Sequence, residues 1–420
     1  MDDKFCCGRL RWIKGEGGID EVREEENQGD KKMKKGRVYP GFVSEIKRFG
    51  RFDFTGCYNC GTCPAVCALS SDSAPFPRRP IQLAIMGLRE EILKSLEPWL
   101  CHDCGDCSKW CPRENEPQHS MGTLRRFLLA QYDWTGIASR IIRSKVFHFI
   151  SLFLTSLLFL LLVWVYHMFI DPDVKGTMST KEFLSTPMDL SHMFAPPHPV
   201  MWYFTLFAIL FPILMVGINV LRMWKWTMSD LKVPFSIYVK ELLTYIRHSV
   251  THENIRKCEE TKTRWTPHWL MAFGCVLMLV ILVFALPWFQ TDKVHPLYHP
   301  QRWLGYIATI FMLYGSGDVL LSRIRKKSVV HKYSEFSDIT FPLLLFLVSL
   351  SGILLHILRI AGLSLATHYA YAVHMAITLP MLLIELPFGK WSHMIYRPMA
   401  VYFQRVKESF MEKQQMREAA

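Results

Sequence analysis

The chain has 420 residues, of which 50% are hydrophobic, and its formal net charge is +12. This length allows two or three domains. The basic residues gather in loops between apolar stretches, so the charge reports membrane topology and no nucleic-acid partner is expected. No apolar stretch follows the first residues, so we expect no secretory signal peptide.

Charged residues dominate positions 1–37, which include the acidic run Glu24-Glu25-Glu26. This composition predicts a disordered tail. Four cysteines lie outside the regular cysteine runs described next, and all four are expected to be free thiols without an assigned role: Cys6, Cys7, Cys258 and Cys275.

Two runs of four cysteines follow the tail, with the same spacing in each. They are Cys57-x-x-Cys60-x-x-Cys63-x-x-x-Cys67 and Cys101-x-x-Cys104-x-x-Cys107-x-x-x-Cys111-Pro112. In ferredoxins with two [4Fe-4S] clusters, the fourth cysteine of each run ligates the cluster of the other run. The spacing therefore predicts cluster 1 on Cys57, Cys60, Cys63 and Cys111, and cluster 2 on Cys101, Cys104, Cys107 and Cys67. A zinc ribbon needs only two cysteines per knuckle, and a disulfide framework needs an oxidising compartment.

The residues around these runs favour helices. Apolar residues recur at helical spacing over 81–96, between the two runs, and a further helix is expected over 122–132. Residues 38–140 are therefore predicted to form an α-helical ferredoxin domain with two cubane clusters.

Six long apolar segments follow, over 146–170, 200–223, 269–289, 303–321, 339–358 and 369–388. Each is long enough to cross a hydrocarbon core of about 30 Å. Six such segments leave too little polar surface for a soluble protein. We therefore expect a mainly α chain, with a six-helix transmembrane domain over 141–398 and a C-terminal tail over 399–420.

Basic residues mark one side of this membrane domain. The loops after the second and fourth segments are rich in arginine and lysine, whereas the opposite loops carry few. The rich side is expected to face the cytoplasm. This places the ferredoxin domain and both termini on the cytoplasmic side of the inner membrane.

Histidines near both ends of the apolar segments suggest two haem b sites, because imidazole is a good axial ligand. His268 and His393 are expected near the cytoplasmic face, and His374, His356 and His167 near the outer face. Histidines at helix ends also occur as polar tips in the headgroup region. His374 and His393 are 19 residues apart, about 28 Å along a helix, so one helix can supply a ligand to each site. We expect Pro380, Pro387 and Gly389 to unwind this helix locally and adjust the relative rotation of the two side chains.

Several strings resemble the quinone-interacting membrane-bound oxidoreductase (Qmo) family, specifically its membrane component QmoC, which is itself similar to a fusion of the ferredoxin and cytochrome b components of heterodisulfide reductases. They are Cys57-Tyr58-Asn59-Cys60-Gly61-Thr62-Cys63, Pro75-Phe76-Pro77-Arg78-Arg79, Trp99-Leu100-Cys101-His102-Asp103-Cys104-Gly105-Asp106-Cys107 and Tyr132-Asp133-Trp134-Thr135-Gly136. The resemblance covers about residues 38 to 400.

The last five apolar segments also resemble the cytochrome b subunit of respiratory nitrate reductase. The likeness rests on Trp265-Thr266-Pro267-His268, on Leu320-Leu321-Ser322-Arg323 and on Leu386-Pro387-Phe388-Gly389-Lys390-Trp391-Ser392-His393. It implies that His268 and His393 hold the inner haem, and that His374 holds the outer one.

The chain departs from that pattern at Met278, where a second histidine is expected about ten residues after His268. His356 or His167 must replace it, or the outer haem is absent or differently ligated. We expect His356, because its helix precedes that of His374 and ends at the same depth.

The resemblance to Qmo implies a membrane oxidoreductase subunit that oxidises menaquinol. Electrons would pass through b haems and the two clusters to heterodisulfide-reductase-like flavoprotein A and B subunits, and finally to adenylyl-sulfate reductase. The reverse direction is equally compatible with these residues. Two alternatives stay open: a membrane subunit of another heterodisulfide-reductase-like complex, and a haem-free membrane anchor.

Overall fold

Helices form all the regular secondary structure in the residues that the computed structural model describes. These residues are 37–52, 54, 56–71, 74–170, 179–185, 198–252, 262–285, 295–296 and 298–418. The expectations for the tail over 1–36 and for Cys6, Cys7 and Cys258 lie outside them. The mainly α prediction is confirmed.

Eight short helices build the part of the chain that carries the cysteine runs. They are α1 (Phe42–Lys47), α2 (Thr62–Ala65), α3 (Arg78–Ile85), α4 (Arg89–Lys94), α5 (Glu97–Leu100), α6 (Asp106–Lys109), α7 (Pro117–Tyr132) and α8 (Ile137–Arg143). Phe127 of α7 lies at their centre, with ring centroids 5.4 Å from Phe42 and 5.6 Å from Phe49. The predicted helix over 122–132 is confirmed and begins earlier, at Pro117.

The single helix predicted over 81–96 is wrong, because the chain breaks it into α3 and α4. Gly87 between them has φ +74°, and its carbonyl accepts a hydrogen bond of 2.8 Å from the Tyr39 backbone. A Cβ at Gly87 would stand 2.6 Å from the Tyr39 carbonyl oxygen. The close approach of a distant segment of backbone therefore ends the helix, and periodicity alone does not reveal it.

Six helical spans are long and apolar enough to cross a membrane, as predicted. They are α9 (Lys145–Phe169), α11 (His198–Thr227), α13 (Lys262–Phe284), α15 (Pro300–Ile324), α16 (Phe336–Ile360) and the sixth span, which runs through α17 (Ser364–Pro380), the π-helical turn η5 (Met381–Glu385) and α18 (Leu386–Phe388). Their outer faces are apolar; on α9, Phe153 is 58% exposed and Leu157 50%. Such surfaces suit a lipid environment, and by length and composition the chain is a multi-pass membrane protein.

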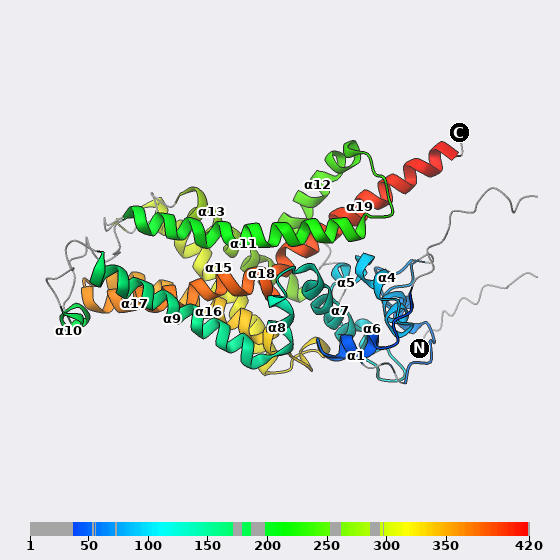
Figure 1. The fold of residues 1–420 in the computed structure, drawn as a ribbon, viewed down its shortest axis with the longest axis horizontal. Coiled ribbons are helices and arrows are strands. Elements are labelled where there is room, and N and C mark those ends of the chain that lie inside the picture. Colours follow the sequence, from blue (N-terminus) through cyan, green and yellow to red (C-terminus); the bar gives the residue numbers. More distant parts are fainter. Residues whose placement is uncertain are drawn as a thin grey trace, which may run out of the picture. The chain divides into compact units, whose positions relative to one another are not determined.

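The spans pack in an order that leaves α13 and α17 apart. Helix α13 packs on α15, α15 on α16, α16 on α17, and α17 on α9. Helix α11 meets α9 and α17 through Ala208, which clusters with Phe159 and Leu379. Figure 1 shows these long helices running side by side, with α4, α5, α6 and α7 gathered at one end. We call this end proximal and the opposite end distal.

The sixth span unwinds where the prolines and Gly389 predict it. After η5 and α18, Gly389 adopts extended backbone, and the short helix η6 (Lys390–Ser392) leads into α19 (His393–Glu418). Residues 399–418, expected from the sequence to form a tail, continue α19. There Phe403 and Val406 are buried in the main core.

Helices α19 and α12 (Phe235–Thr251) pack on each other at the proximal end. α12 connects the second and third spans and was not predicted. One hydrophobic core joins these helices, the cysteine-bearing part and α11, and residues Val38–Ala420 form one compact unit. Trp99, Tyr132 and Tyr396 meet at this junction, with Trp99 and Tyr396 ring centroids 5.1 Å apart. The helices α10 (Thr180–Ser185) and η4 (Val329–His331) complete the described elements.

Candidate functional site

The two cysteine runs fold into matching loops. Asn59 and Asp103, one residue before the second cysteine of each run, have φ +62° and +61°. Gly61 and Gly105, one residue after it, have φ +86° and +91°, and each precedes a four-residue helix, α2 or α6. The repeated left-handed positions turn each loop back on itself, so that its first three cysteines surround one point. The duplication inferred from the spacing is therefore present in the backbone.

The cysteines group across the two runs. Cys63 interacts electrostatically with Cys57, Cys60 and Cys111, and these four cysteines line one cavity of about 380 Å³. Cys67 interacts electrostatically with Cys101 and Cys104 instead, although it belongs to the first run. Among the cysteines, Cys107 interacts most strongly with Cys101, Cys104 and Cys67. The neighbours of Cys111 and Cys67 are those that crossed ligation requires.

The cysteine thiols suit a cofactor that carries positive metal charge. Burial is the main cause that raises the pKa of Cys63 to about 11 and that of Cys67 to about 12, and the charge of neighbouring cysteines contributes to both shifts. Gathering four thiolates in such a place needs a compensating metal charge, which an iron–sulfur cluster supplies. Among the described residues, no three His, Cys, Asp or Glu side chains converge closely enough for a single metal ion. Cys275 is a buried free thiol, as predicted.

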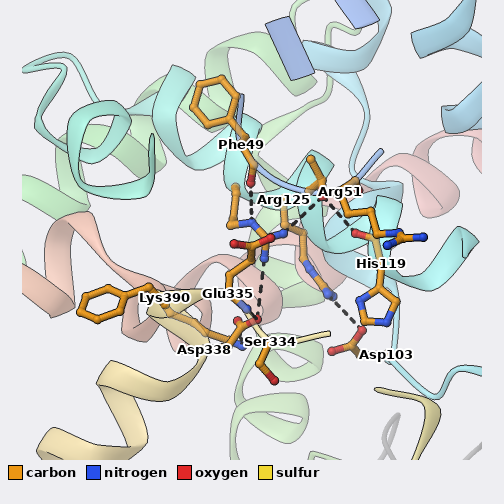
Figure 2. Close-up of polar contacts among 12 residues, drawn as sticks. Phe49, Arg51, Asp103, His119, Arg125, Ser334, Glu335, Asp338 and Lys390 are labelled. Atoms are coloured by element: carbon orange, nitrogen blue, oxygen red, sulfur yellow. Dashed lines mark hydrogen bonds and ion pairs between the residues drawn. The ribbon is translucent and has the colours of Figure 1, made fainter. Parts of the chain in front are cut away.

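A charged cavity of about 220 Å³ lies between the second cysteine loop and the proximal ends of the spans. Asp103 accepts a hydrogen bond of 2.6 Å from Gln118 Nε2. It also pairs with Arg125 at 3.3 Å, as Figure 2 shows. Arg264 of α13 donates to the Asp103 carbonyl at 3.2 Å. Burial alone would raise the pKa of Asp103, but Arg125, Arg397 and Gln118 hold it well below its usual range. The second cysteine loop is thus tied to α13.

The same cavity receives the start of α16. Asp338 pairs with Lys390 and lies 4.0 Å from Arg126 of α7 (Figure 2). Tyr333, in the loop before α16, packs edge-on against His119 and beneath Arg51. The cysteine-bearing part therefore contacts the loop between α15 and α16. Basic residues are frequent in this loop, and they predict that it lies on the same side of the membrane as the clusters.

His268 and His393 both line this charged cavity, and both also line a smaller one of about 50 Å³ beside it. His393 Nδ1 lies 2.5 Å from the Lys390 carbonyl oxygen, to which it donates, so its Nε2 carries no proton in that tautomer. His268 Nδ1 is buried without a hydrogen-bond partner. Because His102 lines both cavities, the second cysteine loop reaches the two imidazoles that the sequence pairs.

Two further histidines at this place were missed by sequence reasoning. His252 lies with its ring centroid 5.4 Å from that of His268, and His248 lies 6.3 Å from His252. Both line the smaller cavity. Their i, i+4 spacing, at the end of an amphipathic helix, was the available signal. This spacing lies in the connection between the second and third spans, of which sequence reasoning used only the basic residues.

A second, mostly apolar cavity of about 320 Å³ lies among α11, α13, α15, α16 and α17, toward the distal end. His374, His356 and Met278 all line it, and His167 is not among its described lining residues. His374 Nδ1 lies 2.9 Å from Ser351 Oγ, and His356 Nε2 lies 2.7 Å from the Tyr306 hydroxyl. The structure therefore brings His374 and His356 to one cavity. His167 is buried on α9, near His368.

A layer of apolar side chains separates the distal cavity from the proximal ones. Phe341 stacks on Trp391 at 5.6 Å and meets His393 edge-on at 6.4 Å. Cys275 lines cavities on both sides of this layer. His268 and His393 thus line cavities on the proximal side of this layer, and His374 and His356 line the cavity on its distal side.

Known proteins resemble both parts of the chain. Residues 53–115 match the 4Fe-4S dicluster domain, which confirms iron–sulfur clusters as cofactors of the N-terminal part. A heterodisulfide reductase HdrC-like protein of Archaeoglobus profundus is 32% identical over 100 residues, which are 24% of this chain and 53% of that relative. The HdrC component of the H(2):CoB-CoM heterodisulfide,ferredoxin reductase of Methanothermobacter thermautotrophicus is 32% identical over 93 residues, 22% of this chain and 48% of the relative.

The chain therefore spans about half the length of these curated relatives, and the likeness concerns its iron–sulfur part. No solved structure matches the chain. The membrane spans from α11 onward, with α19, match a different model, that of citrate utilization protein B, over residues 188–414. Because this match covers more than half of the chain, the protein belongs to the citrate utilization protein B family.

Proposed function

We propose that this chain is the membrane subunit of a Qmo-like, quinone-interacting oxidoreductase. In this proposal it takes electrons from menaquinol and delivers them to heterodisulfide-reductase-like flavoprotein A and B subunits, which serve adenylyl-sulfate reductase. When bound, two haems b and two [4Fe-4S] clusters would supply one-electron carriers across the membrane and into the cytoplasm. The clusters would be held by the two crossed cysteine groups.

The observation that carries the proposal is a pair of matching histidines on the two sides of the apolar layer, His374 in the sixth span and His393 just after it. His374 and His393 each direct Nδ1 at an oxygen, and each lines a cavity. A ligating histidine generally donates its second N–H in this way, which fixes the tautomer and leaves Nε2 for the metal. An anchor without haem has no need of this arrangement.

The proximal cavity also suits the carboxylates of a haem. Basic side chains outnumber acidic ones in its lining; the basic set is Arg51, Arg125, Arg126, Arg264, Arg323, Lys390 and Arg397. Guanidinium groups pair well with carboxylates because their paired N–H donors match two oxygens. We propose His268 and His393 as the axial ligands at this place.

The distal cavity has a polar mouth suited to a quinol. Tyr306 and His356 share a hydrogen bond there, and Arg302 and Arg359 line the same cavity. The imidazole of such a pair can accept a proton that a quinol releases on oxidation, and the hydroxyl can hold the imidazole in place. The rest of the lining is largely apolar, as a quinone ring requires.

The other end of the proposed electron path reaches the protein surface. Cys57 and Cys60 are exposed, and the aromatic side chains of Tyr58 and Trp110 beside the cysteine loops are 69% and 61% exposed. Exposed aromatic residues of this kind are common in protein interfaces. The names of the curated relatives describe them as components of heterodisulfide reductases, or as similar to one. We place the flavoprotein partners at this surface, on the cytoplasmic side.

The test uses the full-length chain, purified in detergent with its cofactors. We expect two haems b and two [4Fe-4S] clusters per chain. We also expect the dithionite-reduced haem bands to be reoxidised by a soluble menaquinone analogue. A preparation with intact clusters but no haem would overturn the proposal and favour the anchor. Full haem without reoxidation by the quinone analogue would overturn its quinone part.

A second measurement separates the Qmo-like complex from other heterodisulfide-reductase-like complexes. The chain is tagged in its native host, and the co-purifying proteins are identified. We expect flavoprotein A and B subunits, and menaquinol-dependent reduction of adenylyl sulfate after addition of adenylyl-sulfate reductase. Flavoprotein partners that support no such reduction would favour the alternative complex.

A further inference from the structure

Met278 and His374 line the distal cavity from different spans. Met278 is a half-buried residue of α13, and it lines the cavity together with His374 of α17. In the packing order of the spans, α15 and α16 stand between these two helices. A group with two axial ligands needs donors from two separate places, and α13 and α17 are two non-adjacent helices that both line this cavity.

Hydrogen bonding fixes the direction in which His374 can bind a metal. The Ser351 hydroxyl donates to the Val348 carbonyl at 3.1 Å, so its oxygen accepts from His374 Nδ1. Both acceptors belong to α16, and the His374 ring also lies against Gly352 of that helix. Because Nδ1 is engaged with Ser351, Nε2 is the nitrogen available to a ligand in the cavity that His374 lines. A ligand bound there would be completed from another helix.

His356 is less well placed to complete it. His356 belongs to α16, the helix on which the His374 ring packs, and lies one turn beyond Gly352. Its Nε2, the usual ligating nitrogen, shares the 2.7 Å hydrogen bond with the Tyr306 hydroxyl. Binding a metal through this nitrogen would break that hydrogen bond. The two ligands, His356 and His374, would then come from α16 and α17, which pack directly on each other.

The other sulfur groups around the cavity are also less suitable. Cys275, Met312 and Met381 are buried in the apolar layer below it, at 3%, 4% and 4% exposure. Cysteine binds metals as a thiolate, and placing that charge in an apolar membrane interior is costly. Met375 stands next to His374 on the same helix. Met278 supplies a neutral donor on a long, flexible side chain.

We propose that Met278 Sδ and His374 Nε2 are the two axial ligands of the distal haem, so that this site is His/Met rather than bis-histidine. The inference rests on the proposed function, because it assumes a haem in this cavity. Helices α13 and α17–α19 then supply both pairs, His268 with His393 and Met278 with His374. Methionine ligation raises the reduction potential of a haem relative to histidine ligation. Electron transfer from a quinol to the distal haem would therefore be favoured, whereas transfer from the distal to the proximal haem would need a driving force. His356 is left free for hydrogen bonding at the mouth.

The test compares haem content, spectra and potential in four full-length proteins: wild type, Met278→His, Met278→Leu and His356→Phe. In the wild type we expect two haems, one with the far-red charge-transfer band and near-infrared magnetic circular dichroism of thioether-ligated ferric haem. Met278→His should keep two haems, lose these thioether signals and lower the midpoint potential of one haem. Met278→Leu should lose the same signals. His356→Phe, the matched control, should keep both haems and the signals.

The outcomes separate this inference from the proposed function. Two haems in the wild type, both with bis-imidazole spectra, would overturn Met278 as a ligand and leave the proposed function standing. Loss of the distal haem in His356→Phe, with Met278→Leu unchanged, would do the same and favour His356. Fewer than two haems in the wild type would overturn both. Because Met278→His retains a ligand, its spectrum can be read even if Met278→Leu fails to fold.

Discussion

His148 Nε2 and Glu385 Oε1, 237 residues apart in the chain, lie 2.6 Å from each other in a site closed to solvent. His148 lies in the first turn of α9 and is 1% exposed, while Glu385 ends the π-helical turn of the sixth span and is fully buried. Lys390 is close to Glu385 in the sequence and is the partner that proximity suggests, but Lys390 pairs with Asp338. The histidine–carboxylate pair therefore fastens α9 to the turn that leads to His393.

Removing one member of this pair should destabilise the membrane part. Glu385→Leu leaves the buried imidazole without its partner, which costs about 1–3 kcal/mol of unfolding free energy. The double variant His148→Phe/Glu385→Leu should recover most of this loss, because a well-packed apolar pair needs no hydrogen bond. Thermal unfolding in detergent measures both. Equal destabilisation of the single and double variants would contradict the pairing as the cause.

Crossed cluster ligation predicts how cysteine variants group by spectrum. Cys63→Ala and Cys111→Ala should both damage cluster 1 and leave the same residual electron paramagnetic resonance signal. Cys67→Ala and Cys104→Ala should leave the other signal, since Cys67 lies with Cys101 and Cys104. Cys275→Ala, at a buried thiol far along the chain, is the control and should keep both signals. Uncrossed ligation would instead group Cys67→Ala with Cys63→Ala.

The features that the sequence predicted correctly are those with a local signal. Cysteine spacing specifies the cluster loops, and apolar length specifies the six spans. The unwinding after Pro380 follows from two prolines and a glycine in one short stretch. Each of these is written into neighbouring residues, so no knowledge of distant contacts is needed.

The features that it missed depend on distant contacts. Gly87 ends a helix because Tyr39 approaches it, and Glu385 of the sixth span meets His148 of the first, 237 residues away in the sequence. His252 reaches His268 only because α12 folds back at the proximal end. Met278 and His374 belong to different spans and line one cavity only because the helices pack around it. Pattern reading has no access to such relationships.

The proximal haem should depend on His393 and not on His252. His393 already directs Nδ1 at the Lys390 carbonyl, whereas His252 lies at the end of α12, beside His268. We therefore expect His393→Ala to lose one of two haems, as measured by the pyridine haemochrome assay, and His252→Ala to keep both. The reverse result would assign the proximal pair to His252 and His268.

The close packing of α13 on α15 should make Gly315 intolerant of a side chain. A Cβ at this position would overlap Met271 Cβ and stand 2.5 Å from the Pro267 carbonyl oxygen, one residue before His268. Neither backbone nor Cβ can move away without shifting α13, so Gly315→Ala should lower the unfolding free energy by about 1–3 kcal/mol. Gly317→Ala is the matched control on the same helix, because its Cβ would make ordinary contact with the Phe346 ring at 3.7 Å.

Thermal unfolding followed by haem absorbance should show a lower midpoint for Gly315→Ala alone. Since Pro267 precedes His268, the proximal haem spectrum should also change in Gly315→Ala and stay unchanged in Gly317→Ala; equal behaviour of the two variants would contradict the packing argument.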